Sequence, residues 1–208
     1  MPRRGALICY AAPMPDPVVV VDYDPTWPAL FATLRAPVAA ALGDVAVAVE
    51  HVGSTAIPGL AAKPIIDLDV AIRSAADLPE AIRRLARLGY AYEGDKGIPG
   101  RAAFAWPPQA ARHHLYVCAL DAAAYRQHLL FRDYVRAHPE AVAAYAALKR
   151  QLAARYRAHR DAYTEAKGPF VHAAMARAEE WARVTGWGSP GKTDLSQEPE
   201  FTLYAGEP

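Results

Sequence analysis

The chain has 208 residues, of which 53% are hydrophobic, and this suits a single domain with one good core, or a single domain with an appendage. Lys and Arg number 23 against 22 Asp and Glu, so the net charge of +1 provides no field that would attract a long nucleic acid or an anionic membrane. Two cysteines argue against a disulfide framework, and no stretch approaches the roughly 20 apolar residues needed to cross a bilayer. We therefore expect a soluble, cytoplasmic protein.

The two ends of the chain carry few signs of packed structure. Residues 1–17 contain two arginines, a short apolar run and then three closely spaced prolines. That run of about eight residues is near or below the lower limit for a signal peptide, so we interpret residues 1–17 as a disordered leader. Residues 186–208 are rich in Gly, Pro, Ser and acidic side chains, which predicts a flexible tail.

The first elements expected between these ends are a helix and two strands. Asp24-Pro25 can start a helix that carries an apolar stripe and ends at Gly43. Residues 45–52 read VAVAVEHV and residues 65–72 read IIDLDVAI, and both runs are typical of buried strands. We expect them to be the two central strands of a sheet, joined by an ordered loop rich in Gly and Pro.

The rest of the chain predicts more strands and then helices. Residues 78–88 have helical spacing, and the strand expected directly after them would complete a βαβ-like unit. Short strands are also expected at residues 102–106 and 113–119, in an irregular, partly antiparallel sheet. Residues 121–185 have helical spacing, and two prolines divide them into three helices. The expected fold is α+β, with a mixed sheet flanked by helices in a core of residues 18–120 and a helical segment packed on it.

Asp67 and Asp69 are the residues that most clearly indicate chemistry. They stand two apart on a predicted strand, so both side chains project from one face, within reach of a shared cation. Hard divalent ions such as Mg²⁺ bind carboxylate oxygens and complete their shell with water and phosphate. Carboxylates that simply face water are the alternative, but the apolar residues around them predict a buried strand, where unpaired anions are expensive. The pattern favours a metal site.

Gly53 and Ser54 follow the first of the two predicted strands. A glycine there lets the backbone approach a phosphate, and a hydroxyl or exposed amides can donate to the phosphate oxygens. Gly-Ser turns are common, so the pair alone is weak evidence. A strand, Gly-Ser, a loop and then Asp-x-Asp on a second apolar strand are together much more specific, and they predict a site for a nucleotide and a metal.

The segment HVGSTAIPGLAAKPIIDLDV resembles the signature of the GrpB family, which belongs to the polymerase-beta-like nucleotidyltransferase superfamily. VVDYDPTWPALFATLR, GIPGR, RHHLYV and FRDYVRAHPEAVAAYAALKRQLAARY also resemble parts of that family, and together the similarity covers residues 18–184. The resemblance implies a nucleotidyltransferase-like fold in which Gly53 and Ser54 hold the phosphates of ATP or another nucleoside triphosphate. It also implies that Asp67 and Asp69 are the first two carboxylates that bind Mg²⁺ or Mn²⁺.

One strand departs from the superfamily, whose enzymes place a third carboxylate there. It reads HHLYV in this chain and contains no acid. His114 and Tyr116 share one face of it, so His114 is a candidate catalytic residue that would act as a metal ligand, a phosphate donor or a general base. The GrpB pattern has a second histidine where this chain has Tyr116, which weakens any role for a pair of histidines.

Other side chains near these motifs are candidate ligand contacts, and each has an ordinary structural role as its alternative. Thr55 and Lys63, near the two ends of the loop, are candidates for nucleotide binding. The candidates for substrate binding are His51, Arg101, Arg112, Tyr116 and Arg132.

Three functions follow from these motifs. The first is a Mg²⁺-dependent enzyme that transfers a nucleotidyl group from ATP or another nucleoside triphosphate to a small-molecule acceptor, directly or through an adenylate in a ligation. The second is a nucleotide-binding module of reduced activity that assists a partner enzyme. GrpB-like domains occur fused to dephospho-CoA kinase, but the phosphate loop GxxxxGK(S/T) is absent from this sequence. The third is a metal-dependent hydrolase that uses His113 or His114 with Asp67, although the histidine spacing matches no zinc pattern.

Overall fold

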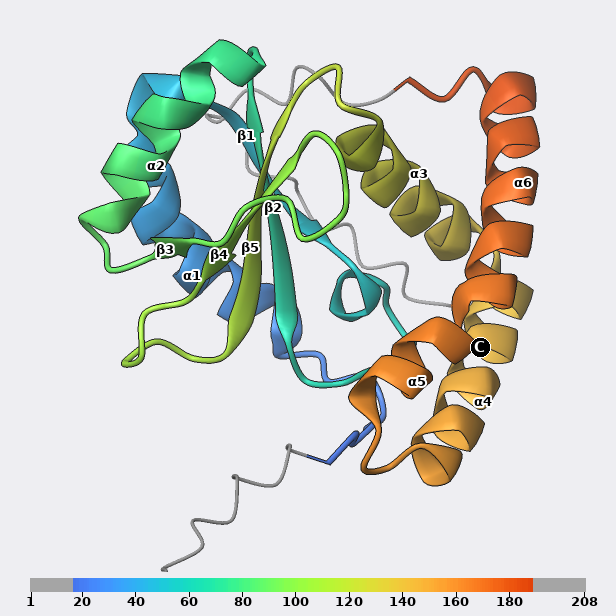
Figure 1. Ribbon diagram of the computed structural model, residues 1–208. Coiled ribbons are helices and arrows are strands. Elements are labelled where there is room, and N and C mark those ends of the chain that lie inside the picture. Colours follow the sequence, from blue (N-terminus) through green and yellow to red (C-terminus); the bar gives the residue numbers. More distant parts are fainter. Residues whose placement is uncertain (1–16, 189–208) are drawn as a thin grey trace, which may run out of the picture.

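The computed structural model describes residues 17–188, and a mixed sheet of five strands forms its centre (Figure 1). The strands lie in the order β1-β2-β5-β4-β3; β2 and β5 are parallel, and every other neighbouring pair is antiparallel. Their bounds are β1 Ala46–Val52, β2 Ile66–Ile72, β3 Ala91–Tyr92, β4 Arg101–Ala105 and β5 His113–Ala119. The predicted α+β class with a mixed sheet is confirmed. The predicted leader and tail, apart from their inner ends, lie outside the described residues.

Helices cover both faces of this sheet. α1 and α2 lie on one face, α3 lies on the other, and α4, α5 and α6 follow beside α3 (Figure 1). The bounds are α1 Trp27–Leu42, α2 Leu78–Ala86, α3 Ala123–Ala137, α4 Pro139–Arg155, α5 Arg160–Ala166 and α6 Gly168–Thr185. Short 3₁₀ turns are η1 Gly43–Val45, η2 Ser54–Ala56 and η3 Ala75–Asp77. Within residues 17–188, no helix has the length and apolar character needed to cross a membrane.

The C-terminal segment contains one helix more than the sequence predicts. The breaks expected at His138-Pro139 and at Gly168-Pro169 are present, because α4 and α6 begin there with proline in their first turn. A further break separates α4 from α5 at residues 156–159. Those residues include no proline or glycine, so nothing local to the sequence signals the end of α4.

Two expectations about strand order are wrong. β1 was expected to be central, but it pairs only with β2 and forms one edge of the sheet. The expected βαβ-like unit is absent, because β3, which follows α2, lies at the opposite edge and runs antiparallel to β4. β5 takes the parallel position beside β2 instead. The physical reason is burial: both residues of β3 are exposed, and a central strand must bury both of its faces.

β2 sends alternate side chains into two different layers. Leu68 lies in the core that the sheet forms with α1 and α2. Ala71 lies in a second cluster, formed with α3 on the other face. Asp67 and Asp69 lie four and two positions before Ala71 on the strand, so their side chains point to the same face as that of Ala71. Both carboxylates therefore face the helical layer of α3. The alternation therefore separates the site from the largest core.

Arg132 attaches α3 to the sheet. Its guanidinium donates to the Glu50 carboxylate at 2.8 Å and to the His51 carbonyl at 3.0 Å, both on β1, and to its neighbour Asp133 at 2.7 Å. Asp133 also accepts a hydrogen bond from the Trp187 indole at 3.1 Å, which ties the end of the described chain to α3. Arg132 is only 7% exposed, so these charges are held away from solvent.

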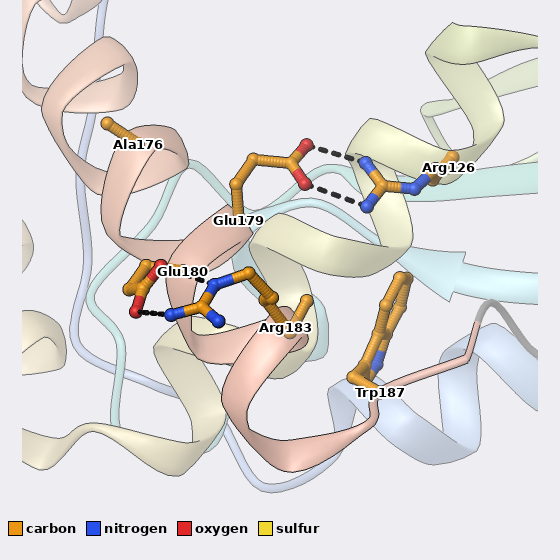
Figure 2. Close-up of a pocket in the computed structure, with 7 residues that line it drawn as sticks. Arg126, Ala176, Glu179, Glu180, Arg183 and Trp187 are labelled. Atoms are coloured by element: carbon orange, nitrogen blue, oxygen red, sulfur yellow. Dashed lines mark hydrogen bonds and ion pairs between the residues drawn. The ribbon is translucent and has the colours of Figure 1, made fainter.

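A second arginine of α3 makes a surface contact instead. Arg126 forms two hydrogen bonds with Glu179 of α6, at 2.5 and 2.7 Å, and both side chains are about half exposed (Figure 2). They line a surface hollow together with a second ion pair, Arg183 with Glu180. The charged side chains that line this hollow therefore pair with one another, so the hollow is a poor candidate for binding a charged ligand.

The two arginines of α3 should differ sharply in their effect on stability. Arg132→Met leaves the mostly buried Glu50 without its cation and Asp133 with only its longer ion pair to Arg136, so we expect the free energy of unfolding to fall by about 3–5 kcal/mol. Arg126→Met removes only an exposed pair and should cost less than about 1 kcal/mol. Urea denaturation of both variants measures the difference, and equal losses would contradict this account of how α3 is attached.

Candidate functional site

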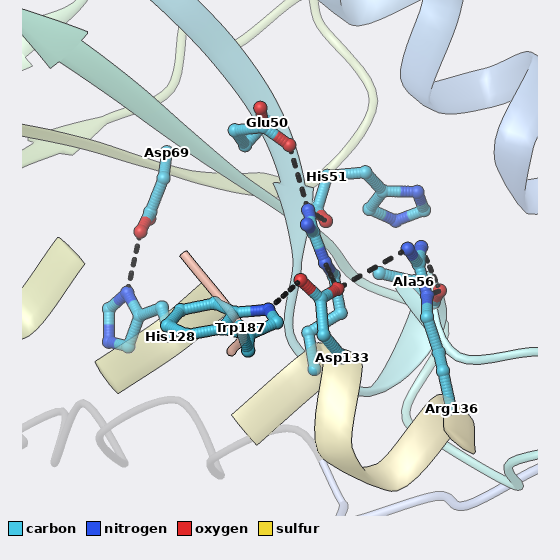
Figure 3. Close-up of polar contacts among 9 residues, drawn as sticks. Glu50, His51, Ala56, Asp69, His128, Asp133, Arg136 and Trp187 are labelled. Atoms are coloured by element: carbon cyan, nitrogen blue, oxygen red, sulfur yellow. Dashed lines mark hydrogen bonds and ion pairs between the residues drawn. The ribbon is translucent and has the colours of Figure 1, made fainter. Parts of the chain in front are cut away.

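Asp67 and Asp69 of β2 are each held by a histidine. His114, the neighbour of Asp67 on β5, places Nδ1 2.6 Å from Asp67 Oδ1. His128 of α3 places Nδ1 2.6 Å from Asp69 Oδ2 (Figure 3). An ionised carboxylate can only accept hydrogen bonds, so in each pair Nδ1 donates, and the neutral ring keeps Nε2 as an acceptor. The structure thus brings together the three residues predicted to be catalytic and adds His128.

His128 is a site residue that sequence reasoning missed. It lies 59 positions after Asp69, and only the packing of α3 on the sheet brings the two together. One signal was available: His128 stands four positions before Arg132 on the same predicted helix, so the two side chains share a helix face. Because Arg132 was already a candidate, its neighbour one turn earlier was a reasonable addition.

The carboxylate of Asp69 is fully buried and only partly satisfied. Its Oδ1 has no hydrogen-bond partner among residues 17–188. Burial raises the pKa of Asp69 above its usual value, while the hydrogen bond from His128 and the charge of Arg101 act in the opposite direction. Burial also disfavours the charged form of His128, but Asp69 outweighs this and raises the pKa of His128. A buried carboxylate oxygen without a partner is costly, and a bound cation would satisfy it.

Gly53 brings the Gly-Ser turn against Asp67. A Cβ at this position would lie 2.2 Å from Asp67 Oδ2, and the backbone φ of 70° is one that side chains rarely adopt. Ser54 follows as the first residue of η2 and is partly exposed. Arg136 of α3 donates to the Ala56 carbonyl at 2.5 and 2.8 Å, which fixes the far end of this turn (Figure 3). The Gly-Ser turn therefore lies directly against the Asp67 carboxylate.

A third acid does face this side of the sheet, but it is already neutralised. Glu50 of β1 lies beside Asp69 in the strand register, and its carboxylate pairs with Arg132. On β5, the residue beside Asp69 is Tyr116. Within the part of the chain that the structure describes, no group of three or more His, Cys, Asp or Glu is arranged to hold a metal ion. Any cation here would have two protein carboxylates and would need ligand or water oxygens for the rest.

Tyr116 and Arg101 complete the same face. The Arg101 guanidinium stacks on the Tyr116 ring, with its central carbon 4.3 Å from the ring centroid. The Tyr116 ring also lies 6.1 Å from the rings of both His114 and His128. Burial raises the pKa of Tyr116 to about 12, so its hydroxyl stays protonated and able to donate at neutral pH. These two predicted substrate contacts are thus adjacent to both aspartate–histidine pairs.

Three other predicted ligand residues make contacts that suit a structural role. The His51 ring stacks on Phe31 of α1 at 4.7 Å, on the opposite face of the sheet from Asp67. Its Nε2 meets the Thr55 hydroxyl at 3.0 Å, and that hydroxyl donates to the Ile65 carbonyl. Burial lowers the pKa of His51 to about 4, so the ring is neutral. The third residue, Arg132, is occupied by the contacts that attach α3.

Lys63 and Arg112 lie at the rim, near the start of β2 and β5. The Lys63 ammonium is 5.6 Å from the centroid of the Tyr163 ring, and the Arg112 guanidinium is 5.7 Å from that of Trp106. Both residues are partly buried. Burial, followed by the charges of neighbouring cations, lowers the pKa of Lys63 to about 8. The phosphate contact predicted for Lys63 stays a prediction.

Comparisons with known sequences point to one family. The family model described as "GrpB protein" matches residues 17–177. The UPF0157 protein YqkA of Bacillus subtilis is 34% identical over 166 residues, which cover 80% of this chain and 48% of YqkA. A UPF0157 protein of Pseudomonas aeruginosa is 38% identical over 167 residues, 78% of this chain and 68% of that protein. A protein of Mycolicibacterium paratuberculosis named dephospho-CoA kinase is 32% identical over 198 residues, 82% of this chain and 48% of the kinase.

This chain therefore spans about half the length of YqkA and of that kinase. Among solved structures, the conserved protein GrpB of Enterococcus faecalis has a TM-score of 0.71 and 32% identity. The alignment covers 78% of this chain and 99% of that one, so the similarity extends over nearly the whole of the smaller protein. Sequence and structure agree, and this chain belongs to the GrpB family.

Proposed function

We propose that this chain binds a nucleoside triphosphate and a divalent cation at Asp67 and Asp69, and transfers the nucleotidyl group to a small-molecule acceptor. One observation carries the proposal: two carboxylates share a face of β2, each fixed by a histidine, and Asp69 keeps a buried oxygen without a partner among the described residues. The glycine turn that abuts Asp67 is the second support. ATP is the triphosphate suggested by the family resemblance.

The residues present fit Mg²⁺ or Mn²⁺. Mg²⁺ at nucleotide sites is commonly bound through one or two carboxylates, with phosphate and water oxygens in its other positions. Each histidine occupies one oxygen of its carboxylate, which leaves Asp67 Oδ2 and Asp69 Oδ1 as the candidate ligands. When bound, the cation would neutralise charge on the phosphates during transfer. With only two carboxylates, binding is expected to be much tighter in the presence of the nucleotide than without it.

His114 is the candidate base for activating the acceptor. Asp67 fixes its Nδ1, so Nε2 of the neutral ring can accept a proton, the arrangement in which a carboxylate orients a catalytic histidine. In the proposed step an acceptor hydroxyl gives its proton to Nε2 and its oxygen bonds to the α-phosphorus. The bond from that phosphorus to the bridging oxygen breaks, and pyrophosphate leaves. If the acceptor is a carboxylate, no proton is transferred and an acyl-adenylate forms when the triphosphate is ATP. A second nucleophile can then attack the acyl carbon and release AMP, which completes a ligation.

A nucleotide-binding module that assists a partner enzyme is the second candidate. Tyr116 stands beside Asp69 on β5, the strand where the superfamily places a third carboxylate, and the third acid on this face is neutralised by Arg132. Some relatives are named dephospho-CoA kinase and are about twice as long as the matched region. Residues 1–208 contain no phosphate loop GxxxxGK(S/T), so they do not themselves supply kinase activity of that type.

Loss of either carboxylate charge should abolish transfer. Asp67→Asn and Asp69→Asn keep the shape of the side chain, and we expect each to reduce product formation roughly 100-fold or more. Asp121→Asn, in an exposed turn, is the matched control and should retain activity. The assay incubates the protein with each nucleoside triphosphate, Mg²⁺ or Mn²⁺ and a metabolite extract, and detects pyrophosphate and nucleotidylated products by mass spectrometry.

The outcomes of that assay separate the two candidates. Products that depend on Asp67 and Asp69 support the transferase. Nucleotide binding without any product favours the partner module. Failure to bind any nucleotide or divalent cation contradicts both.

Gly53→Ala should disrupt the site more than its backbone strain alone explains. The new Cβ would displace the Asp67 carboxylate, so we expect nucleotide binding to weaken at least tenfold. Gly94→Ala is the control, because Gly94 has a similar φ of 76° but nothing within 4 Å of the added Cβ. Alanine is strained at both positions because φ is positive at each. Calorimetric titration with ATP and Mg²⁺ compares them, and equal affinities would rule out the packing of the turn on Asp67 as a functional feature.

A further inference from the structure

Lys149 of α4 is a buried lysine that forms no ion pair with a carboxylate and no hydrogen bond from its ammonium in the described part of the chain. Its side chain is 2% exposed, and its ammonium has no hydrogen-bond partner among residues 17–188. The ammonium lies over the ring of Tyr145, 4.5 Å from the ring centroid. A ring face compensates a buried charge only in part. A buried ammonium with no hydrogen bond destabilises a fold, so a ligand role is the simplest reason to keep it.

Two further lysines converge on the same region from other parts of the chain. Lys63 precedes β2, and Lys167 links α5 to α6. Their ammonium groups lie 5.6 and 4.8 Å from the centroid of one buried ring, Tyr163. α4, α5 and α6 meet beside the chain that leads into β2 (Figure 1). Lys149 lies on α4, and the charge of Lys167 acts on both Lys63 and Lys149.

The three lysines repel one another and lack a local counter-ion. None of them forms an ion pair with a carboxylate in the described part of the chain. Burial, together with the charges of Lys167 and Arg150, lowers the pKa of Lys149 to about 7. Burial likewise lowers the pKa of Lys167, and Arg160 adds to the effect. The charge of Asp67 acts on all three lysines and favours their charged forms.

We propose that Lys63, Lys149 and Lys167 form a binding site for a chain of two or more phosphates, beside the cation site at Asp67. One phosphate carries a charge of about −1.5 to −2 near neutral pH, which is less than the charge of three lysines once a bound anion keeps them protonated. A pyrophosphate group supplies the missing charge. The inference rests on the proposed function, because it assigns this site to the β- and γ-phosphates that leave as pyrophosphate.

The test measures binding without the cation, so that it does not depend on Asp67 and Asp69. Thermal unfolding and calorimetric titration are recorded in EDTA with pyrophosphate, tripolyphosphate, inorganic phosphate and AMP. The variants are Lys149→Met and Lys167→Met, with Arg150→Met as the control, since Arg150 lies on the same helix but is exposed and paired with Asp22. We expect pyrophosphate and tripolyphosphate to raise the melting temperature of the wild type, whereas phosphate and AMP leave it unchanged.

The variants should separate binding from stability. Lys149→Met removes an uncompensated buried charge, so without ligand it should melt at a higher temperature than the wild type, yet bind pyrophosphate at least tenfold more weakly. Arg150→Met should bind as the wild type does. Wild-type affinity in both lysine variants would overturn the inference. So would equal responses to phosphate and pyrophosphate, which indicate a site for one phosphate, such as that of an acceptor.

These results are distinguishable from failure of the proposed function. Suppose that the protein binds pyrophosphate through these lysines but forms no nucleotidylated product. That result would support the phosphate site and contradict the proposed transferase activity. A product that forms in Lys149→Met with the wild-type KM for the triphosphate would retain the transferase and overturn the phosphate site.

Discussion

The complete burial of the Asp69 carboxylate between β2 and α3 is the constraint on which the site depends. His128 satisfies one of its oxygens, and the other has no partner in the described chain. The contacts of Arg132 with β1 hold α3 on the sheet and so keep His128, one helical turn away, in reach of Asp69. The fold therefore stabilises a buried charge that packing alone would not favour, as is expected where residues are kept for a ligand.

Opposite charges are supplied from the two sides of this site. The sheet provides the carboxylates of Asp67 and Asp69, and the C-terminal helices with the loop before β2 provide lysines without counter-ions. A triphosphate with its divalent cation has the complementary charges, because the metal ion binds carboxylates and the phosphates bind ammonium groups. Under the proposed function, the helical segment is part of the ligand site as well as a cover for the sheet, and its buried lysines reduce stability but contribute to binding.

The sequence predicts those parts of the site that are set by local pattern. The spacing of Asp67 and Asp69 places both on one face of β2, and the Gly-Ser turn lies beside them. The alternation of side chains along β1 could also have excluded His51 from the substrate contacts. Val52 lies beside Asp67 in the strand register, so the side chain of its neighbour His51 points to the other face of the sheet. Strand order could not be predicted in the same way, because it depends on which strand best buries both faces. The distant partner His128 reaches Asp69 only through the packing of α3 on the sheet, which no local spacing encodes. The proposed places of Lys149 and Lys167 likewise depend on helix packing.

The most direct test of the account is a crystal structure of this protein with Mn²⁺ and an ATP analogue that cannot be cleaved. The account predicts an anomalous peak for Mn²⁺ in contact with Asp67 and Asp69, with the phosphates running from the Gly53 turn toward Lys149 and Lys167. A nucleotide and Mn²⁺ ordered on another surface, or carboxylates without metal at saturating ligand, would contradict it.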